Sequence, residues 1–147
     1  MNITIERANE SMADVFGDIE SLVYPNGKHW SGEMFFKDMK ESNRLYLVAK
    51  DGEKIIGFIS ASYFMENADI LRVAVLPEYQ GKDVATELMA ELFDGLKKLL
   101  VKKIMLEVNK ANDKAQGLYE KVGFKEISNR KNYYGKGQDG LIYSVEL

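Results

Sequence analysis

Residues 76–89 read LPEYQGKDVATELM, and this stretch decides the fold that we expect for the chain. It leads from the end of an apolar segment through a turn at Gly81 into an amphipathic helix. The residues that recur at helical spacing and predict its buried face are Val84, Leu88, Met89, Leu92, Leu96 and Leu99. Because the first turn of a helix presents unpaired backbone N–H groups, a helix that begins near Lys82 can hold an anion such as a phosphate.

An acidic residue, Asp83, lies within this turn and opposes an anion there. A carboxylate about 4 Å from a phosphate charge costs about 1 kcal/mol in water and about 4 kcal/mol at an effective dielectric of 20. Lys82 can offset the smaller of these costs, and aspartate is also a common residue at helix N-caps. We therefore expect the Asp83 side chain to point to solvent while its backbone N–H faces the anion.

The rest of the chain predicts a mixed sheet with helices on both faces, an α/β (α+β) arrangement in a single domain of residues 1–147. The expected strands lie at about 2–7, 44–50, 54–64, 69–76, 102–109, 124–134 and 139–147, and the other helices at about 12–23, 31–40 and 112–121. Asp51-Gly52 is typical of a hairpin turn. Ser11, with Asp14 three residues later, resembles a capping box at the start of the first helix. The residues of that helix that recur at helical spacing and predict its apolar face are Met12, Val15, Phe16, Ile19, Leu22 and Val23.

Composition limits the possible functions. The formal net charge of −3 provides no general basic surface, so we expect no direct binding of nucleic acid. The chain has no cysteine, which excludes disulfides, thiolate metal sites and a cysteine nucleophile. The one histidine, His29, stands without paired carboxylates, so we expect no metal and assign it to packing or substrate contact. The first residues lack signal-peptide features and no apolar run reaches about 18 residues, so we expect a cytoplasmic protein without membrane contact.

One motif near the end of the chain matches a known binding pattern only by chance. Residues 135–140 read GKGQDG and fit the G-x-G-x-x-G pattern of dinucleotide-binding proteins. That pattern functions only after a strand and at the start of a helix, with an acidic residue about 20 positions later. The residues after Gly140 are too few and are strand-like, so we expect a hairpin loop here.

Two blocks of the sequence resemble the GNAT family of N-acetyltransferases. The stretch PEYQGKDVA (77–85) is similar to the family's coenzyme A pyrophosphate loop, Gln/Arg-x-x-Gly-x-Gly/Ala. Gln80 and Ala85 match that pattern, whereas Asp83 replaces its central glycine. The second block, LYEKVGF (118–124), follows at the family's spacing. The resemblance implies the GNAT fold, one mixed and mostly antiparallel sheet of about seven strands flanked by about four helices, and acetyl-CoA as the acetyl donor.

Three further residues are candidates for the site, and each also has a purely structural explanation. In KIMLEVN (103–109), Glu107 is an acid on the strand face opposite Ile104, Leu106 and Val108, where it could simply be solvated. Residues seven apart on a helix lie within about 20° of each other, so Asn112 and Tyr119 share a face. Asn112 could simply cap its helix, and Tyr119 could belong to the core.

Nearly the whole chain resembles one branch of the family, the bacterial ribosomal-protein alanine N-acetyltransferases. The similar stretches are VAV (73–75), LEV (106–108) and RKNYY (130–134), besides the blocks above. The resemblance implies that Glu107 is the general base and Tyr119 the general acid of a direct transfer to the N-terminal alanine of a small-subunit ribosomal protein. The residues that it implies for binding acetyl-CoA are Val73, Ala74, Val75, Gly81, Lys82, Asp83, Val84, Ala85, Thr86 and Asn112.

Alternatives to this function remain open at the level of sequence. The stretch HWS (29–31) lacks the proline that this branch carries before its tryptophan, and the loop after Tyr134 also differs. The acceptor could therefore be another amine, on a small metabolite or another protein N-terminus. A coenzyme-A-binding regulatory module without turnover would account for Asp83, whereas the presence of both Glu107 and Tyr119 favours an enzyme. Aromatic residues that could line a peptide groove, or simply pack, are Trp30, Tyr133 and Tyr134.

Overall fold

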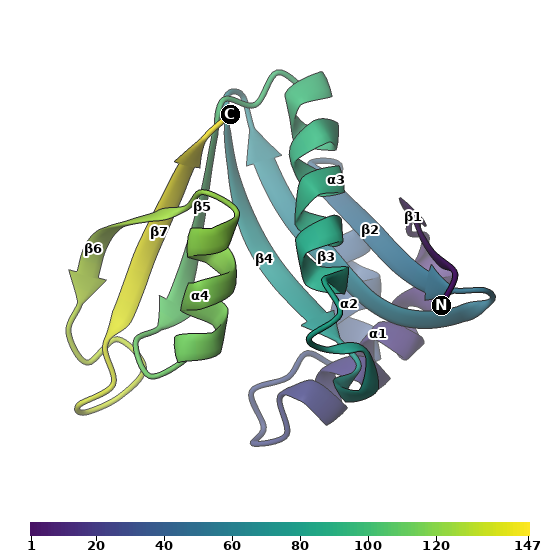
Figure 1. The fold of residues 1–147 in the computed structure, drawn as a ribbon, viewed down its shortest axis with the longest axis horizontal. Helices are drawn as coiled ribbons and strands as arrows, with labels where there is room; N and C mark the ends of the chain where they lie inside the picture. Colours follow the sequence, from purple (N-terminus) through teal and green to yellow (C-terminus); the bar gives the residue numbers. More distant parts are fainter.

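The computed structural model describes residues 1–147 as one seven-stranded sheet with helices on both faces (Figure 1). The strands are β1 (Ile3–Arg7), β2 (Arg44–Asp51), β3 (Lys54–Phe64), β4 (Asn67–Val75), β5 (Lys103–Asn109), β6 (Lys125–Arg130) and β7 (Gly140–Glu146). The helices are α1 (Ala13–Val23), α2 (Gly32–Met39), α3 (Val84–Lys98) and α4 (Asp113–Lys121), with short 3₁₀ turns η1 (Glu10–Met12) and η2 (Pro77–Tyr79). The strand order is β1-β2-β3-β4-β5-β7-β6, and only β4 and β5 pair in parallel. The predicted mixed, mostly antiparallel sheet is therefore confirmed.

Helix α3 covers one face of the sheet and supplies much of the core. Figure 1 shows α3 and α4 on the nearer side and α1 and α2, drawn fainter, on the far side. The buried side chains of α3 are Val84, Leu88, Met89, Leu92 and Leu96, as their spacing predicts. Leu99, which the same spacing placed on the buried face, lies at the C-cap and is 36% exposed. Burying an aliphatic side chain of this size contributes about 1.5–3 kcal/mol. A Cβ on Gly95 would lie 3.0 Å from a Leu45 methyl, so this glycine allows α3 to approach β2 closely.

The start of the first helix differs from the sequence-based expectation. The Asn9 side chain accepts a hydrogen bond from the backbone N–H of Ser11 and caps η1. The Ser11 hydroxyl also bonds to Asn9, so it does not cap α1, which begins two residues later at Ala13. The predicted capping box is wrong because a 3₁₀ turn precedes the helix and uses the serine locally.

The buried face of α1 is also rotated from the predicted one. Leu22, expected on the apolar face, is 63% exposed, whereas the charged Glu20 is completely buried. Glu20 forms an ion pair with Arg72 of β4, and this pair replaces an apolar contact between helix and sheet. A long-range charge pair of this kind is not visible in a local pattern of hydrophobic residues.

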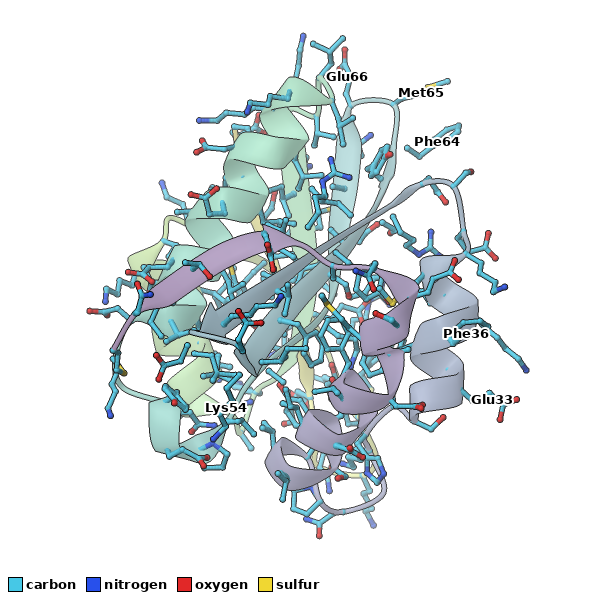
Figure 2. The ribbon with its side chains drawn as sticks, turned by 90° about the vertical axis from the view of Figure 1, so that its right-hand side faces the viewer. Glu33, Phe36, Lys54, Phe64, Met65 and Glu66 are labelled. Atoms are coloured by element: carbon cyan, nitrogen blue, oxygen red, sulfur yellow. The ribbon has the colours of Figure 1, made fainter.

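The sheet is closed at one end and open at the other. At the closed end, where Figure 2 shows Phe64 and Met65 projecting from the β3–β4 hairpin, the N–H groups of Lys102 and Lys103 donate to the Glu66 carbonyl at 2.7 and 3.1 Å. The parallel pairing of β4 and β5 extends only from Asn67–Lys103 to Asp69–Met105. Beyond these pairs the two strands separate toward the bottom of Figure 1.

A bulge in β4 lies at the point where this fork opens. Ser60 of β3 pairs with Arg72 and Ala61 pairs with Ile70, so Leu71 has no partner and the strand bends. As a result, the end of β4, residues 73–75, and the end of β5, residues 107–109, border an opening in the sheet.

No helix in the structure is both long and apolar enough to cross a bilayer.

Candidate active site

A cavity of about 470 Å³ lies at the fork, between the end of β4, the loop before α3, and α4. It gathers residues that are separated by more than forty positions in the chain. The predicted site residues that line it are Val73, Ala74, Val75, Gly81, Asp83, Val84, Ala85, Thr86, Asn112 and Tyr119. Lys82 and Glu107 do not line the cavity, and Tyr24, which the sequence did not suggest, does.

The backbone of β4 forms one wall of the cavity, and two side chains hold it in place. The Tyr24 hydroxyl donates a hydrogen bond to the Val73 carbonyl at 2.6 Å. The Gln80 amide donates to the Val75 carbonyl at 2.9 Å and accepts a hydrogen bond from Lys114 at 2.7 Å. Both polar ends of the Gln80 side chain thus bond within the protein, so Gln80 stabilises the loop before α3.

The turn before α3 contains two residues in the left-handed conformation, Gly81 at φ +74° and Asp83 at φ +64°. Aspartate tolerates this conformation better than most residues other than glycine. This explains how an acid can occupy a position where the family pattern has glycine. Asp83 stands at the N-cap of α3, which begins at Val84 and two residues later than expected, but its side chain forms no capping hydrogen bond.

The Asp83 carboxylate does not cap the helix that it precedes. Its side chain is 70% exposed, which confirms the expectation that it faces solvent, and it pairs with the Lys121 ammonium at 3.1 Å. Lys82, which we expected to offset the charge of Asp83, has its ammonium 5.9 Å from the Tyr79 ring centre. The actual partner comes from the last turn of α4, on the other side of the cavity.

Tyr119 brings a phenol into the cavity from α4. The helix begins at Asn112, whose side chain accepts a hydrogen bond from the Ala115 N–H at 3.1 Å, so the predicted cap is confirmed. Tyr119 is 8% exposed, and its ring packs edge-on against the rings of Phe124 and Tyr143, with ring centres 5.9 and 6.3 Å apart. The Tyr119 hydroxyl forms no hydrogen bond within the protein. It is also not one of the fully buried side-chain atoms that lack a partner, so the hydroxyl remains accessible from the cavity.

The surroundings of Tyr119 keep its hydroxyl protonated. Burial raises the pKa of the phenol above its ordinary value of 10.0, and the neighbouring Tyr24 raises it further. The positive charge of Arg72 acts in the opposite direction and does not cancel the rise in pKa. At physiological pH this phenol is therefore a proton donor.

Glu107 lies on β5, across the fork, with its side chain on the face opposite the buried Leu106 and Val108. Its carboxylate is 3.6 Å from the Arg130 guanidinium of β6 and remains partly exposed. Burial and the negative charge of Glu107 both raise the pKa of the Tyr134 phenol, and Tyr134 in turn raises that of Tyr119. The negative charge of Glu107 therefore acts on Tyr134, and Tyr134 acts on Tyr119.

A buried ion pair supports the wall of the site next to the α1–α2 loop. The Glu20 carboxylate accepts hydrogen bonds from Arg72 Nε at 3.0 Å and from the Trp30 N–H at 3.1 Å. The Arg72 guanidinium lies over the rings of Tyr24 and Trp30, at 5.2 and 5.5 Å from their centres. His29 donates from Nδ1 to the Tyr24 carbonyl at 3.3 Å, in agreement with a packing role.

Comparison with known proteins agrees with this architecture. The model of the acetyltransferase (GNAT) family matches residues 9–124. The ribosomal protein bS18-alanine N-acetyltransferase of Haemophilus influenzae is 36% identical over 111 residues, which cover 76% of this chain and 75% of that protein. The crystal structure of the ribosomal-protein-S18-alanine N-acetyltransferase from Escherichia coli superposes with a TM-score of 0.89 at 26% identity, covering 98% of this chain and 93% of that one.

A more distant structure shares the fold alone. The PaiA N-acetyltransferase from Thermoplasma acidophilum, solved in complex with coenzyme A, has a TM-score of 0.86 at 22% identity, with complete coverage of both chains. The family match covers more than half of this chain, and the relative from Haemophilus influenzae exceeds 30% identity. The chain therefore belongs to the GNAT family of acetyltransferases, whose members take the acetyl group from acetyl-CoA.

Proposed function

We propose that this acetyltransferase moves the acetyl group of acetyl-CoA to the α-amine of an N-terminal alanine, and that its acceptor is ribosomal protein bS18. The observation that carries the proposal is the position of the Tyr119 phenol, in the same cavity as the β4 backbone and the turn before α3. The names of the relatives in Haemophilus influenzae and Escherichia coli support the choice of acceptor.

The donor would bind along the cavity between β4 and α4. The turn before α3 offers N–H groups at the positive end of a helix dipole, a suitable place for a diphosphate. Residues 73–75 lie along a strand edge from which β5 has already separated, and the Val73 and Val75 carbonyls on it are held by Tyr24 and Gln80, so the donor would lie along a fixed backbone. In this arrangement the acetyl end would lie deepest in the fork, next to Tyr119.

Tyr119 is the proposed general acid. Its raised pKa keeps the proton on the phenol, and its hydroxyl has no competing partner within the protein. When the amine attacks the carbonyl carbon, the thiolate that leaves requires a proton. The phenol can donate that proton from its position in the cavity, a role that contributes about 10²–10⁴-fold to rate in enzymes of this kind.

Glu107 is the proposed general base, acting directly or through a water molecule. An α-amine has a pKa of about 7.7–8.0, so a useful fraction is neutral at pH 7. A lysine amine, with a pKa of about 10.4, would cost about 3 kcal/mol more to deprotonate. One partly exposed carboxylate at the edge of the fork therefore suits an N-terminal amine better than a lysine side chain.

The direct test uses acetyl-CoA and a set of peptides that differ only in the first residue. We expect mass spectrometry to find acetylation of peptides that begin with alanine and little acetylation of the others. Transfer only to small-molecule amines would replace the proposed acceptor by a metabolite. Binding of acetyl-CoA without transfer to any amine would indicate a regulatory module and contradict the proposal.

A further inference from the structure

We infer that Asp83 and Lys121 form a charge-balancing clasp across the donor cavity, in which the lysine offsets the acid that replaces the family's glycine. The inference rests on the proposed use of this cavity for acetyl-CoA. It assigns a role in donor binding to Lys121, which lies within the LYEKVGF block (118–124) but was not among the candidate site residues. It also explains how the cavity could accept a diphosphate with a carboxylate at its entrance.

The left-handed backbone of Asp83 makes the clasp possible. With φ +64° and ψ +13°, this residue turns its side chain away from the N–H groups of α3 that a capping aspartate would contact. The carboxylate instead reaches the Lys121 ammonium at 3.1 Å. The first N–H groups of α3 are thereby left without a hydrogen bond to the Asp83 carboxylate.

Lys121 lies in the last turn of α4, where the negative end of the helix dipole favours a cation. The clasp therefore connects the beginning of α3 with the end of α4. Lys114, in the first turn of α4, reaches Gln80 of the same loop at 2.7 Å. The four side chains, Asp83, Lys121, Gln80 and Lys114, all line the cavity, so two bridges cross it.

The clasp is built for ligand binding more than for stability. Its side chains are 70% and 60% exposed, and ion pairs with that exposure contribute little to folding. A diphosphate in the turn would instead meet the carboxylate of Asp83 at close range, and Lys121 is the cation already in contact with that carboxylate. Without Lys121, the repulsion between Asp83 and the donor would act without compensation.

A double-mutant cycle tests this coupling through the dissociation constant for acetyl-CoA, measured by calorimetry at low salt. Asp83→Asn removes the charge but keeps a side chain that tolerates the left-handed backbone. We expect Lys121→Met to weaken binding about tenfold when Asp83 is present and less than about threefold in the Asp83→Asn background. Equal losses in both backgrounds would overturn the inference.

Two controls separate charge from other effects. Lys114→Met makes the same chemical change at the lysine that contacts Gln80, and we expect its effect to be equal in both backgrounds. Asp83→Gly, which also frees the backbone, should bind acetyl-CoA within about threefold of Asp83→Asn. A gain of more than a hundredfold over the unmodified chain would show that Lys121 does not offset Asp83.

Salt provides an independent measurement. Raising the ionic strength from about 0.1 M to 1 M shortens the screening length from about 10 Å to 3 Å, so the coupling between the two residues should shrink. A coupling that is unchanged by salt would contradict an ionic clasp. If the unmodified chain binds no acetyl-CoA, the proposed function fails together with the clasp. If the unmodified chain binds acetyl-CoA saturably but the effects of the Asp83 and Lys121 substitutions are additive, the clasp is contradicted and the proposed function is not.

Discussion

Replacing Tyr119 by phenylalanine removes a single oxygen atom from the candidate active site and keeps the aromatic ring. The ring packs edge-on against Phe124 and Tyr143, and those contacts do not involve the hydroxyl. Because the hydroxyl has no hydrogen-bond partner in the protein, its loss leaves no buried group unsatisfied. We therefore expect the variant to fold and to bind acetyl-CoA within about threefold of the unmodified chain.

The expected loss falls almost entirely on turnover. A general acid contributes about 10²–10⁴-fold, which corresponds to about 2.7–5.4 kcal/mol of transition-state stabilisation. The Tyr119 phenol, whose pKa is raised above 10.0 by burial, is the only proton donor that we assign to the leaving thiolate. We thus expect kcat to fall at least a hundredfold in the Tyr119→Phe variant.

The assay combines steady-state kinetics on a peptide that begins with alanine with calorimetry of acetyl-CoA binding. Tyr143→Phe is the matched control, since it removes a hydroxyl that bonds to Glu120 at 3.0 Å and lies outside the donor cavity. That variant should lose about 1 kcal/mol of stability and less than about twofold in kcat. If Tyr119→Phe lowers binding and turnover equally, or leaves kcat unchanged, the assignment of the general acid is wrong.

Three further predictions follow from the same structure. Glu107→Gln should lower kcat/KM for an alanine peptide, measured from initial rates, by about 10²–10³-fold with little change in acetyl-CoA affinity. A loss in kcat/KM below about threefold would remove Glu107 from the mechanism. The kcat/KM of the unmodified chain should rise with pH through about 7.7–8.0, where the acceptor amine becomes neutral. It should then stay level to about pH 10, because the raised pKa of Tyr119 keeps the phenol protonated. A fall in kcat/KM near pH 9 with the protein still folded would contradict this prediction. Leu92→Ala, at a completely buried position of α3, should cost about 2–5 kcal/mol in urea unfolding, whereas Leu22→Ala, at an exposed position of α1, should change stability by less than about 0.5 kcal/mol.

The regular elements were predictable because their signals are local. Strand β3 lies at 54–64 as expected, since a hairpin turn defines its start and its residues favour strands. Helix α3 buries the predicted residues up to Leu96 because its apolar spacing is regular over four turns. The predicted turn residue Gly52 adopts φ +61° in the two-residue loop between Asp51 and Lys54.

The features that escaped prediction depend on contacts between distant parts of the chain. Tyr24 meets Val73 49 residues away, and Glu20 meets Arg72 52 residues away, so no local pattern could indicate either pair. The face of α1 was misjudged for this reason, because an ion pair occupies a place that hydrophobic spacing assigned to apolar residues. The sequence suggested the adjacent Lys82 as the cation that offsets Asp83, because Lys121 comes near Asp83 only in the folded chain.

The site itself was predictable in its parts and unpredictable in its shape. The motifs indicated β4, the turn before α3, and Tyr119, and all of these border one cavity. The cavity exists because β4 and β5 stop pairing after Asp69 and Met105. Both strands have ordinary strand sequences beyond this point, so the sequence does not reveal where their pairing ends.

One incubation tests the central claim most directly, using the folded chain, acetyl-CoA, and a peptide that begins with alanine and contains an internal lysine. Fragmentation by tandem mass spectrometry then locates the acetyl group. The account predicts acetylation of the α-amine alone, at a rate that Tyr119→Phe lowers at least a hundredfold. Acetylation of the lysine side chain, or no transfer by a chain that is demonstrably folded, would contradict it.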